Sequence, residues 1–242
     1  MMISKFLINA RWIATTAVLA ALANVTALSA QAEEADKLEG INRKVFYVNE
    51  RLDHYVLRPV AVTYTKVIPD PLERGVDNFF SNLGEIGNVV NDVLQGKFKQ
   101  AGLDSSRFLI NTTIGVAGLF DVAARAGIEK SEGEDFGQTL AVWGVGEGPY
   151  LMLPLIGPST LRDAPSKFVD SLTSPLSYVD DVSARNSARA LDLLATRASL
   201  LEYDEIISGD KYLFVRDVYL QRNRHLVNDG AIEDDFGDFE DY

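Results

Sequence analysis

The stretch from Phe136 to Leu161 most constrains how this chain folds. Its 26 residues carry one charge, Glu147, yet include five glycines and three prolines. It is too apolar for an ordinary surface loop, because irregular backbone normally needs water to satisfy its N–H and C=O groups. The glycines and prolines also prevent a continuous helix. The stretch therefore lies in a core or against lipid, where protein or a wet cavity must cover such backbone.

The N-terminus has the pattern of a cleavable export signal. Lys5 and Arg11 precede an uncharged, Ala-rich run, and Ala30-Gln31-Ala32 fits the small-x-small cleavage rule. The alternative is a single transmembrane anchor, because the uncharged run is long for a signal peptide. We expect residues 1–32 to be the signal peptide, residues 33–228 to form an α-helical domain, and residues 229–242 to be an acidic, disordered tail.

Charge and cysteine content exclude several functions. The chain holds 23 basic and 35 acidic side chains, and without residues 1–32 the net charge is −14, which argues against a nucleic-acid partner. The tail contributes seven acidic residues and no basic one, as in a solvated end or a docking tail for a basic partner. With no cysteine, disulfides, thiolate metal sites and thiol catalysis are excluded, and we expect an unlipidated protein.

Apolar residues at steps of three and four predict helices through most of the chain. The first is expected to bend or end at Arg58-Pro59, and the second to start at Pro69-Asp70-Pro71 and close at Gly96. A third is expected from about Phe98 into the uncharged run that ends at Phe120. The residues that define the other stripes are Ile41, Val45, Val48, Leu52, Tyr55, Leu191, Leu194, Ala195, Ala198, Leu201, Tyr212, Val215 and Tyr219. The fold class is therefore all-α.

The chain carries few signals of catalysis. Its two histidines, His54 and His225, are expected at the surface or at helix ends, and no G-x-S-x-G motif is present. The glycines from Gly144 to Gly148 lack the lysine of a P-loop. Glu147 remains a candidate buried general acid of the muramidase type, but no second carboxylate is evident beside it. We expect no enzyme activity, no metal and no cofactor.

Three blocks of residues in a fixed order form a recognisable family pattern. The central block comprises Phe136-Gly137, Thr139-Leu140, Gly144-Val145-Gly146, Gly148-Pro149-Tyr150, Leu153-Pro154, Gly157 and Thr160-Leu161-Arg162-Asp163. The N-terminal block comprises Asn42-Arg43, Phe46 and Arg58-Pro59-Val60-Ala61. The C-terminal block comprises Thr196-Arg197-Ala198, Leu200-Leu201, Val215-Arg216, Tyr219 and Gln221-Arg222. Together the blocks span roughly residues 38–228, and they resemble the MlaA (VacJ) family of Gram-negative outer-membrane proteins.

This resemblance implies a ring of amphipathic helices embedded in the periplasmic leaflet of the outer membrane, enclosing an amphipathic channel and associating with a trimeric porin. It implies removal of mislocalised phospholipid from the outer leaflet, which maintains lipid asymmetry. The phospholipid would pass to a soluble periplasmic carrier and then to an inner-membrane ABC transport complex. The alternatives are a structural, porin-associated envelope protein without transport, and a periplasmic hydrolase that uses Glu147.

The apolar Gly/Pro-rich hairpin is the predicted lipid path, and we expect it to gate the channel. Its candidate residues are Gly144, Gly146, Glu147, Gly148, Pro149, Tyr150, Leu153, Pro154 and Gly157. The family motif in the N-terminal helix adds Asn42, Arg43 and Phe46. Family members carry a lipobox cysteine that this chain lacks, so membrane association is expected to rest on apolar burial of the helices and on the porin.

Overall fold

A computed structural model describes residues 38–205 and 209–230. The predicted signal peptide and all of the predicted tail beyond Gly230 lie outside these residues. The first residues of that predicted tail, Asp229 and Gly230, are described, and Asp229 forms an ion pair with Lys97. The described domain therefore extends slightly past the predicted boundary at residue 228.

The described residues are mostly helical, as the sequence predicts. The α-helices are α2 (Glu39–Leu52), α3 (Arg58–Val67), α4 (Asp70–Gln95), α5 (Phe98–Thr113), α6 (Val122–Arg125), α7 (Phe136–Val142), α8 (Asp163–Thr173), α9 (Val182–Ser199) and α10 (Lys211–Val227). Shorter turns are the π-helix η1 (Asp53–Leu57) and the 3-10 helices η2 (Pro175–Tyr178) and η3 (Leu201–Glu205). The expected hairpin is a two-stranded antiparallel sheet of β1 (Tyr150–Leu153) and β2 (Gly157–Thr160).

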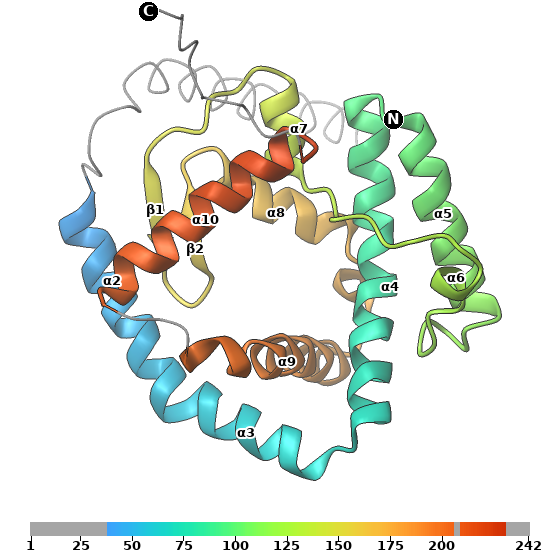
Figure 1. Cartoon of the computed structure of the whole chain (residues 1–242), viewed down its shortest axis with the longest axis horizontal. Coiled ribbons are helices and arrows are strands. Elements are labelled where there is room, and N and C mark those ends of the chain that lie inside the picture. Colours follow the sequence, from blue (N-terminus) through green and yellow to red (C-terminus); the bar gives the residue numbers. More distant parts are fainter. Residues whose placement is uncertain (1–37, 206–208, 231–242) are drawn as a thin grey trace, which may run out of the picture.

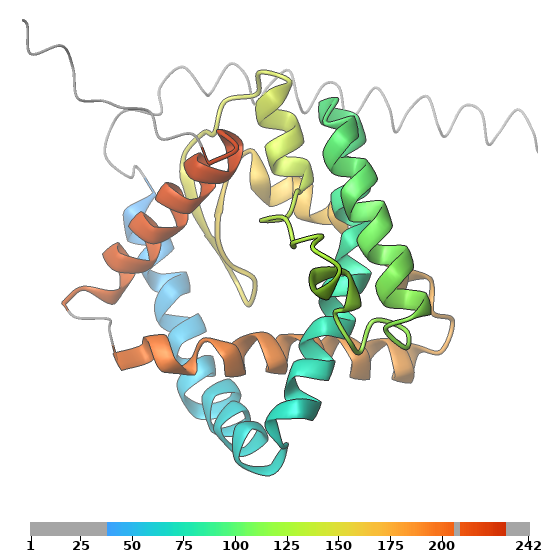
Figure 2. The ribbon, with the colours of Figure 1, turned by 45° about the vertical axis from the view of Figure 1, so that its right-hand side comes forward.

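The helices follow one another around a closed circuit, with the hairpin inside it (Figure 1). Helix α3 packs against α9, and α9 packs against α4, while α2 contacts β1 and α10 contacts β2. The second view agrees, with the tip of the hairpin directed toward the middle of the circuit (Figure 2). Helices α5 and α6 lie outside the circuit, with α5 packed against α4 and α6 packed against α5. The hairpin is thus held from both edges by helices that are distant in sequence.

The helix before Pro59 bends and continues. A proline inside a helix lacks an N–H and its ring presses on the carbonyl four residues earlier. Here the wider π-helical turn η1 precedes it, and the backbone N–H of Arg58 donates to the carbonyl of Asp53. Pro59 then falls in the first turn of α3. The extra residue in the π turn lets α2, η1 and α3 form one curved segment.

Helix α5 ends earlier than the sequence predicts. The uncharged run was expected to stay helical as far as Phe120, but α5 stops at Thr113, and Val116 and Ala117 have φ angles of 56° and 57°. Gly118 follows with a φ of 90°, and a Cβ there would lie 2.7 Å from the Cβ of Asn82 on α4. A glycine is needed because the turn packs directly on α4. The start and end predicted for α4, by contrast, are confirmed.

Polar side chains, rather than large apolar ones, fill the contact between α4 and its neighbours. Arg107 on α5 is buried and donates to Glu85 on α4 at 3.1 Å and to Asp121, the N-cap of α6, at 2.9 Å. Many large apolar side chains face outward instead; Leu109, Ile114 and Phe168 are 59%, 68% and 70% exposed. A surface so rich in exposed apolar side chains is suited to an apolar environment. Within the described residues, no helix is long and apolar enough to span a membrane.

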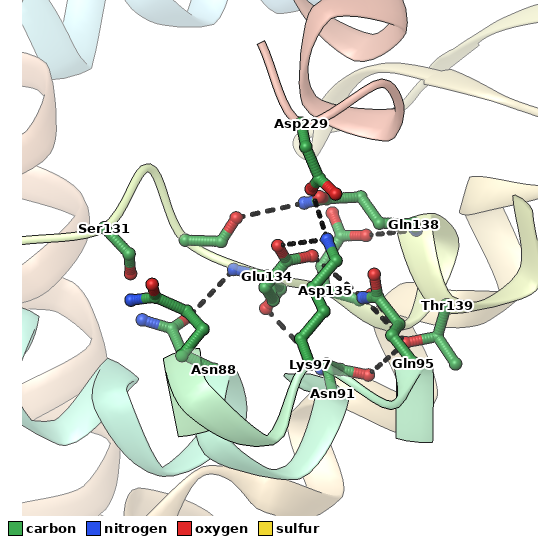
Figure 3. A network of polar contacts seen from close by, with 12 residues as sticks. Asn88, Asn91, Gln95, Lys97, Ser131, Glu134, Asp135, Gln138, Thr139 and Asp229 are labelled. Carbon is green, nitrogen blue, oxygen red and sulfur yellow. Dashed lines mark hydrogen bonds and ion pairs between the residues drawn. The ribbon is translucent and has the colours of Figure 1, made fainter. Parts of the chain in front are cut away.

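The circuit closes where the end of α10 meets the corner between α4 and α5. Lys97 at this corner donates to Glu134 at 2.9 Å and also pairs with Asp229. Gln95 donates to Glu134 at 2.8 Å, and the backbone of Glu134 donates to Asn88 at 3.0 Å (Figure 3). One carboxylate, Glu134, therefore joins α4 to the loop before α7, and Lys97 joins both to α10.

Candidate functional site

The hairpin carries most of the predicted site residues. Its strands are joined by Pro154, Leu155 and Ile156, and Leu155 and Ile156 are 71% and 62% exposed. The ladder continues below the strands, because the N–H of Leu161 donates to the carbonyl of Pro149 at 3.0 Å and that of Arg162 to Glu147 at 3.2 Å. The hairpin is therefore a paired ribbon from its tip down to Glu147 and Arg162, with an apolar tip.

Two asparagines of α2 clamp the free edge of β1. The side chain of Asn42 donates to the carbonyl of Tyr150 and accepts from the N–H of Met152, both at 2.9 Å. Asn49, two helical turns later, donates to the carbonyl of Leu153 and accepts from the N–H of Leu155, again at 2.9 Å. Each amide thus replaces a neighbouring strand. The structure brings Asn42, a residue of the family motif in the N-terminal helix, against the hairpin; sequence reasoning missed Asn49.

Aromatic side chains fill the space between the hairpin, α2 and α10. Tyr150 and Met152 of β1 are buried against Tyr212 of α10, and Phe46 of α2 contacts the Tyr212 ring edge-on, with centroids 5.7 Å apart. Arg43 stacks over Tyr212 at 4.5 Å and donates to Asp210, the N-cap of α10, at 2.8 Å. The predicted residues Arg43, Phe46 and Tyr150 are therefore brought together, around a tyrosine that was not predicted as a site residue.

The chain segments just before β1 and just after β2 both contact Asn223 of α10. Its amide nitrogen donates to Glu147 and to Asp163, both at 3.0 Å. Asp163 also accepts from Thr160 at 2.8 Å and from Tyr219 at 3.1 Å. Burial, together with the nearby Asp163 carboxylate, raises the pKa of the Tyr219 hydroxyl, which therefore stays a proton donor.

Glu147 thus has a second carboxylate, Asp163, on the same amide, although none was evident in the sequence. Asp163 is buried and hydrogen-bonded also to Arg162 at 2.7 Å, so its oxygens are engaged in holding the hairpin root. Arg224 lies 4.0 Å from the other oxygen of Glu147. These contacts hold the backbone at the root of the hairpin in place. The sequence does not predict them, because Asn223 is 76 residues from Glu147 and 60 from Asp163.

The glycines around β1 differ in how well they would tolerate a side chain. Gly144 and Gly148 have φ angles of 88° and 69°, which L side chains rarely adopt. A Cβ on Gly148 would also lie 2.9 Å from the Cβ of Leu161 across the ladder, whereas Gly144 faces open space. Gly157, at the start of β2, has a φ of 95° with open space. Gly148 is therefore required both by backbone angle and by close approach.

We expect Gly148→Ala to destabilise the protein by about 2 kcal/mol, because a left-handed φ costs a non-glycine residue roughly 1–2 kcal/mol and the contact with Leu161 adds to it. Gly144→Ala is the matched control, with the backbone cost alone, about 1 kcal/mol. Unfolding in detergent, followed by circular dichroism, measures both. Equal stabilities of the two variants would show that the Leu161 contact has no effect.

A cavity of about 330 Å³ lies beside the hairpin, between α2, η3 and α10. Its lining is both apolar and polar: the apolar residues are Phe46, Met152, Pro158, Leu200, Tyr203 and Val215, and the polar ones are Asn49, Glu50, Asp53, Arg197, Asp204 and Lys211. Hydrogen bonds to Asp53 raise the pKa of Arg197, with Asp204 adding to the effect. Although burial opposes it, bonds from Arg197 and Arg58 lower the pKa of Asp204. The cavity thus offers fixed charges of both signs beside an apolar wall.

Comparison of the sequence with known proteins shows which family the chain belongs to. A model of the family described as MlaA lipoprotein matches residues 34–226. The chain belongs to the MlaA family. The intermembrane phospholipid transport system lipoproteins MlaA of Escherichia coli K12 and Shigella flexneri are each 38% identical to it over 208 residues, covering 84% of this chain and 82% of the relative. The MlaA protein of Haemophilus influenzae is 30% identical over 240 residues, covering 90% and 93%.

A solved structure described as the structural basis for maintenance of bacterial outer membrane lipid asymmetry has a TM-score of 0.71 to this MlaA family member. It is 41% identical and covers 81% of this chain and 100% of the other. The resemblance found in the sequence is therefore confirmed. The family and its relatives are described as lipoproteins, which contradicts our expectation of an unlipidated protein; that expectation rested only on the absence of cysteine.

Proposed function

We propose that the protein is the outer-membrane component of an intermembrane phospholipid transport system. It removes mislocalised phospholipids from the outer leaflet and so maintains lipid asymmetry. The observation that carries this proposal is the cavity beside the hairpin, whose lining combines the ion-paired Arg197, Asp53 and Asp204 with apolar residues such as Met152 and Val215. Family membership points to the same function.

The chemistry of the cavity matches the chemistry of a phospholipid. A charged headgroup that crosses hydrocarbon without compensation meets a penalty of several kcal/mol or more, and a polar-lined passage removes much of it. The acyl chains need an apolar wall alongside. Phe46, Met152 and Val215 supply such a wall, and the Arg197 ion pairs with Asp53 at 2.7 Å and Asp204 at 2.9 Å supply partners for headgroups of either charge.

The hairpin is the proposed gate of the lipid path. The side chains of Asn42 and Asn49 fix one edge of β1, and Asn223 fixes its root, so the backbone between Gly144 and Gly148 is where a hinge would act. Movement of the hairpin would have to break the asparagine contacts first. Those contacts, rather than the glycines alone, set the free energy of opening.

The remaining assignments rest on the exterior of the helices and on the family. In this proposal the circuit lies in the periplasmic leaflet of the outer membrane, beside a trimeric porin, and the many exposed apolar side chains support that location. A soluble periplasmic carrier then takes the phospholipid toward an inner-membrane ABC transport complex. Residues 1–32 act as the export signal, and the residues after Gly230 form the acidic tail.

The proposal predicts a lipid phenotype. A Gram-negative strain that lacks its own MlaA family protein should accumulate phospholipid on the cell surface, and expression of this chain should restore the low level, as measured with an amine-reactive label that does not cross the outer membrane. Native purification should also yield bound phospholipid and a porin. If the chain co-purifies with a porin yet leaves surface phospholipid high, the structural, porin-associated alternative is correct.

A further inference from the structure

Two buried carboxyl groups face each other between α4 and α5. Asp92, in the last turn of α4, and Asp104, on α5, both have an exposed fraction of 0%. Neither carboxyl oxygen of Asp92 has a hydrogen-bond donor among the described residues. A buried carboxylate without a donor is strongly disfavoured, so this group is stable only in its neutral form.

Asp104, unlike Asp92, has a hydrogen-bond donor on each of its carboxyl oxygens. Gln100 donates to one of its oxygens at 2.7 Å, and Ser131 donates to the other at 3.0 Å. Asp92 touches Asp104 directly, and a contact between two carboxyl groups is a hydrogen bond only if one of them holds a proton. Asp104 therefore accepts, and Asp92 donates.

The other charged groups around Asp92 do not supply the missing donor. Glu134, in the loop before α7, adds a second negative charge, and Lys97, at the corner, is bonded to Glu134 and Asp229 (Figure 3). Arg107, one turn beyond Asp104, is engaged by Glu85 and Asp121. Burial first, then Asp104 and Glu134, raise the pKa of Asp92 to about 7, and Lys97 opposes them.

We propose that Asp92 and Asp104 share one proton, and that this proton fastens α5 to the end of α4, so that its loss at alkaline pH loosens the α5–α6 arm. The arm lies outside the circuit and meets it through α4 (Figure 1). Farther along the same contact, Asn82 donates to Thr112 at 2.8 Å and Arg107 pairs with Glu85, and neither contact depends on this proton. The loosening is therefore local to the start of α5.

The direction of the pH effect follows from the raised pKa. The unfolded or opened state binds the Asp92 proton with an ordinary pKa near 4, and the packed state with a pKa of about 7. The stabilisation is complete below the lower value and is lost as pH rises through the higher one. Asp170 on α8 also has a raised pKa, about 6, because of burial, but it accepts from the backbone of Phe136 and lies away from α5.

The test uses the full chain in detergent at about pH 5.5 and pH 8.5. Infrared spectroscopy should show the carbonyl band of a buried carboxylic acid that is lost at the higher pH, and the difference from Asp92→Asn should isolate it. Hydrogen exchange of the amides of residues 98–104, corrected for intrinsic rates, should be about ten-fold faster at the higher pH in the wild type and unchanged in Asp92→Asn.

Asp170→Asn is the matched control and should keep the pH response of α5. The infrared measurement on the wild type needs no variant to fold. The shared proton is ruled out if Asp92→Asn still shows every carboxylic-acid band of the wild type. It is also ruled out if the α5 amides of Asp92→Asn keep the wild-type pH response. Asp104→Asn provides a second check, since it should likewise abolish the response.

Discussion

Replacing Asn42 and Asn49 together by leucine is expected to release the hairpin from α2. The four hydrogen bonds at 2.9 Å would be lost, and the two buried backbone groups of β1, the carbonyl of Tyr150 and the N–H of Met152, would have no replacement partner. At about 1 kcal/mol for each bond, with a further cost for groups left buried and unpaired, the clamp loses roughly 4 kcal/mol or more. Leucine has the same number and branching of side-chain heavy atoms as asparagine, so it keeps the shape while removing the hydrogen-bonding groups.

The release has a direct readout because the chain has no cysteine. A nitroxide on Leu155→Cys reports the hairpin tip alone, and its spectrum should become markedly more mobile in the double variant. Surface phospholipid in the complemented strain should rise toward the level of the strain without the protein. Asn186→Leu, at an exposed position of α9, is the matched control and should change neither. An unchanged tip spectrum in the clamp variant would contradict the proposed anchoring.

Replacing Arg107 by alanine is expected to be the most destabilising single change, by about 3–5 kcal/mol. Arg107 and Glu85 are both nearly fully buried, and Arg107 also binds Asp121 and the carbonyl of Ile128. Its removal leaves a buried carboxylate with no cation. Chemical unfolding in detergent, followed by circular dichroism, measures the loss.

Arg224→Ala provides the comparison for that prediction. Arg224 is 70% exposed and lies 4.0 Å from Glu147, so its ion pair is screened by solvent and contributes less than about 1 kcal/mol. A similar small loss for Arg107→Ala would mean that water enters the α4–α5 contact and replaces the guanidinium.

The sequence predicts the helices well, but an apolar stripe alone does not tell which face of a helix is buried. On α4, the apolar residues Val90 and Leu94 are 38% and 40% exposed. The fully buried residues of α4 are Asn82, Glu85, Asn91 and Asp92. A hydrophobic stripe marks the core only when water is the surrounding solvent. Where lipid is the expected surroundings, the same stripe marks the outside.

The sequence indicates which segments form the candidate site, but it does not indicate which residues contact one another there. Glycine and proline spacing located the hairpin, and the family motif located Asn42, Arg43 and Phe46. The roles of Asn49, Asn223 and Asp163 depend on partners far away in sequence, and no local pattern marks them. The spacing of Asn42 and Asn49 by seven residues, two turns on one face of α2, is the one signal that indicates a shared partner.

The position of α10 in the circuit has a consequence for how the protein is made. Helix α10 is the last described element, and it packs on the hairpin. Its N-cap Asp210 accepts a hydrogen bond from Arg43 near the start of the domain, and Asp229, just after its end, pairs with Lys97. Until it arrives, the apolar faces it covers stay open and the circuit is incomplete. Folding therefore completes only after nearly the whole chain is available, and contacts between its distant ends make this last step slow.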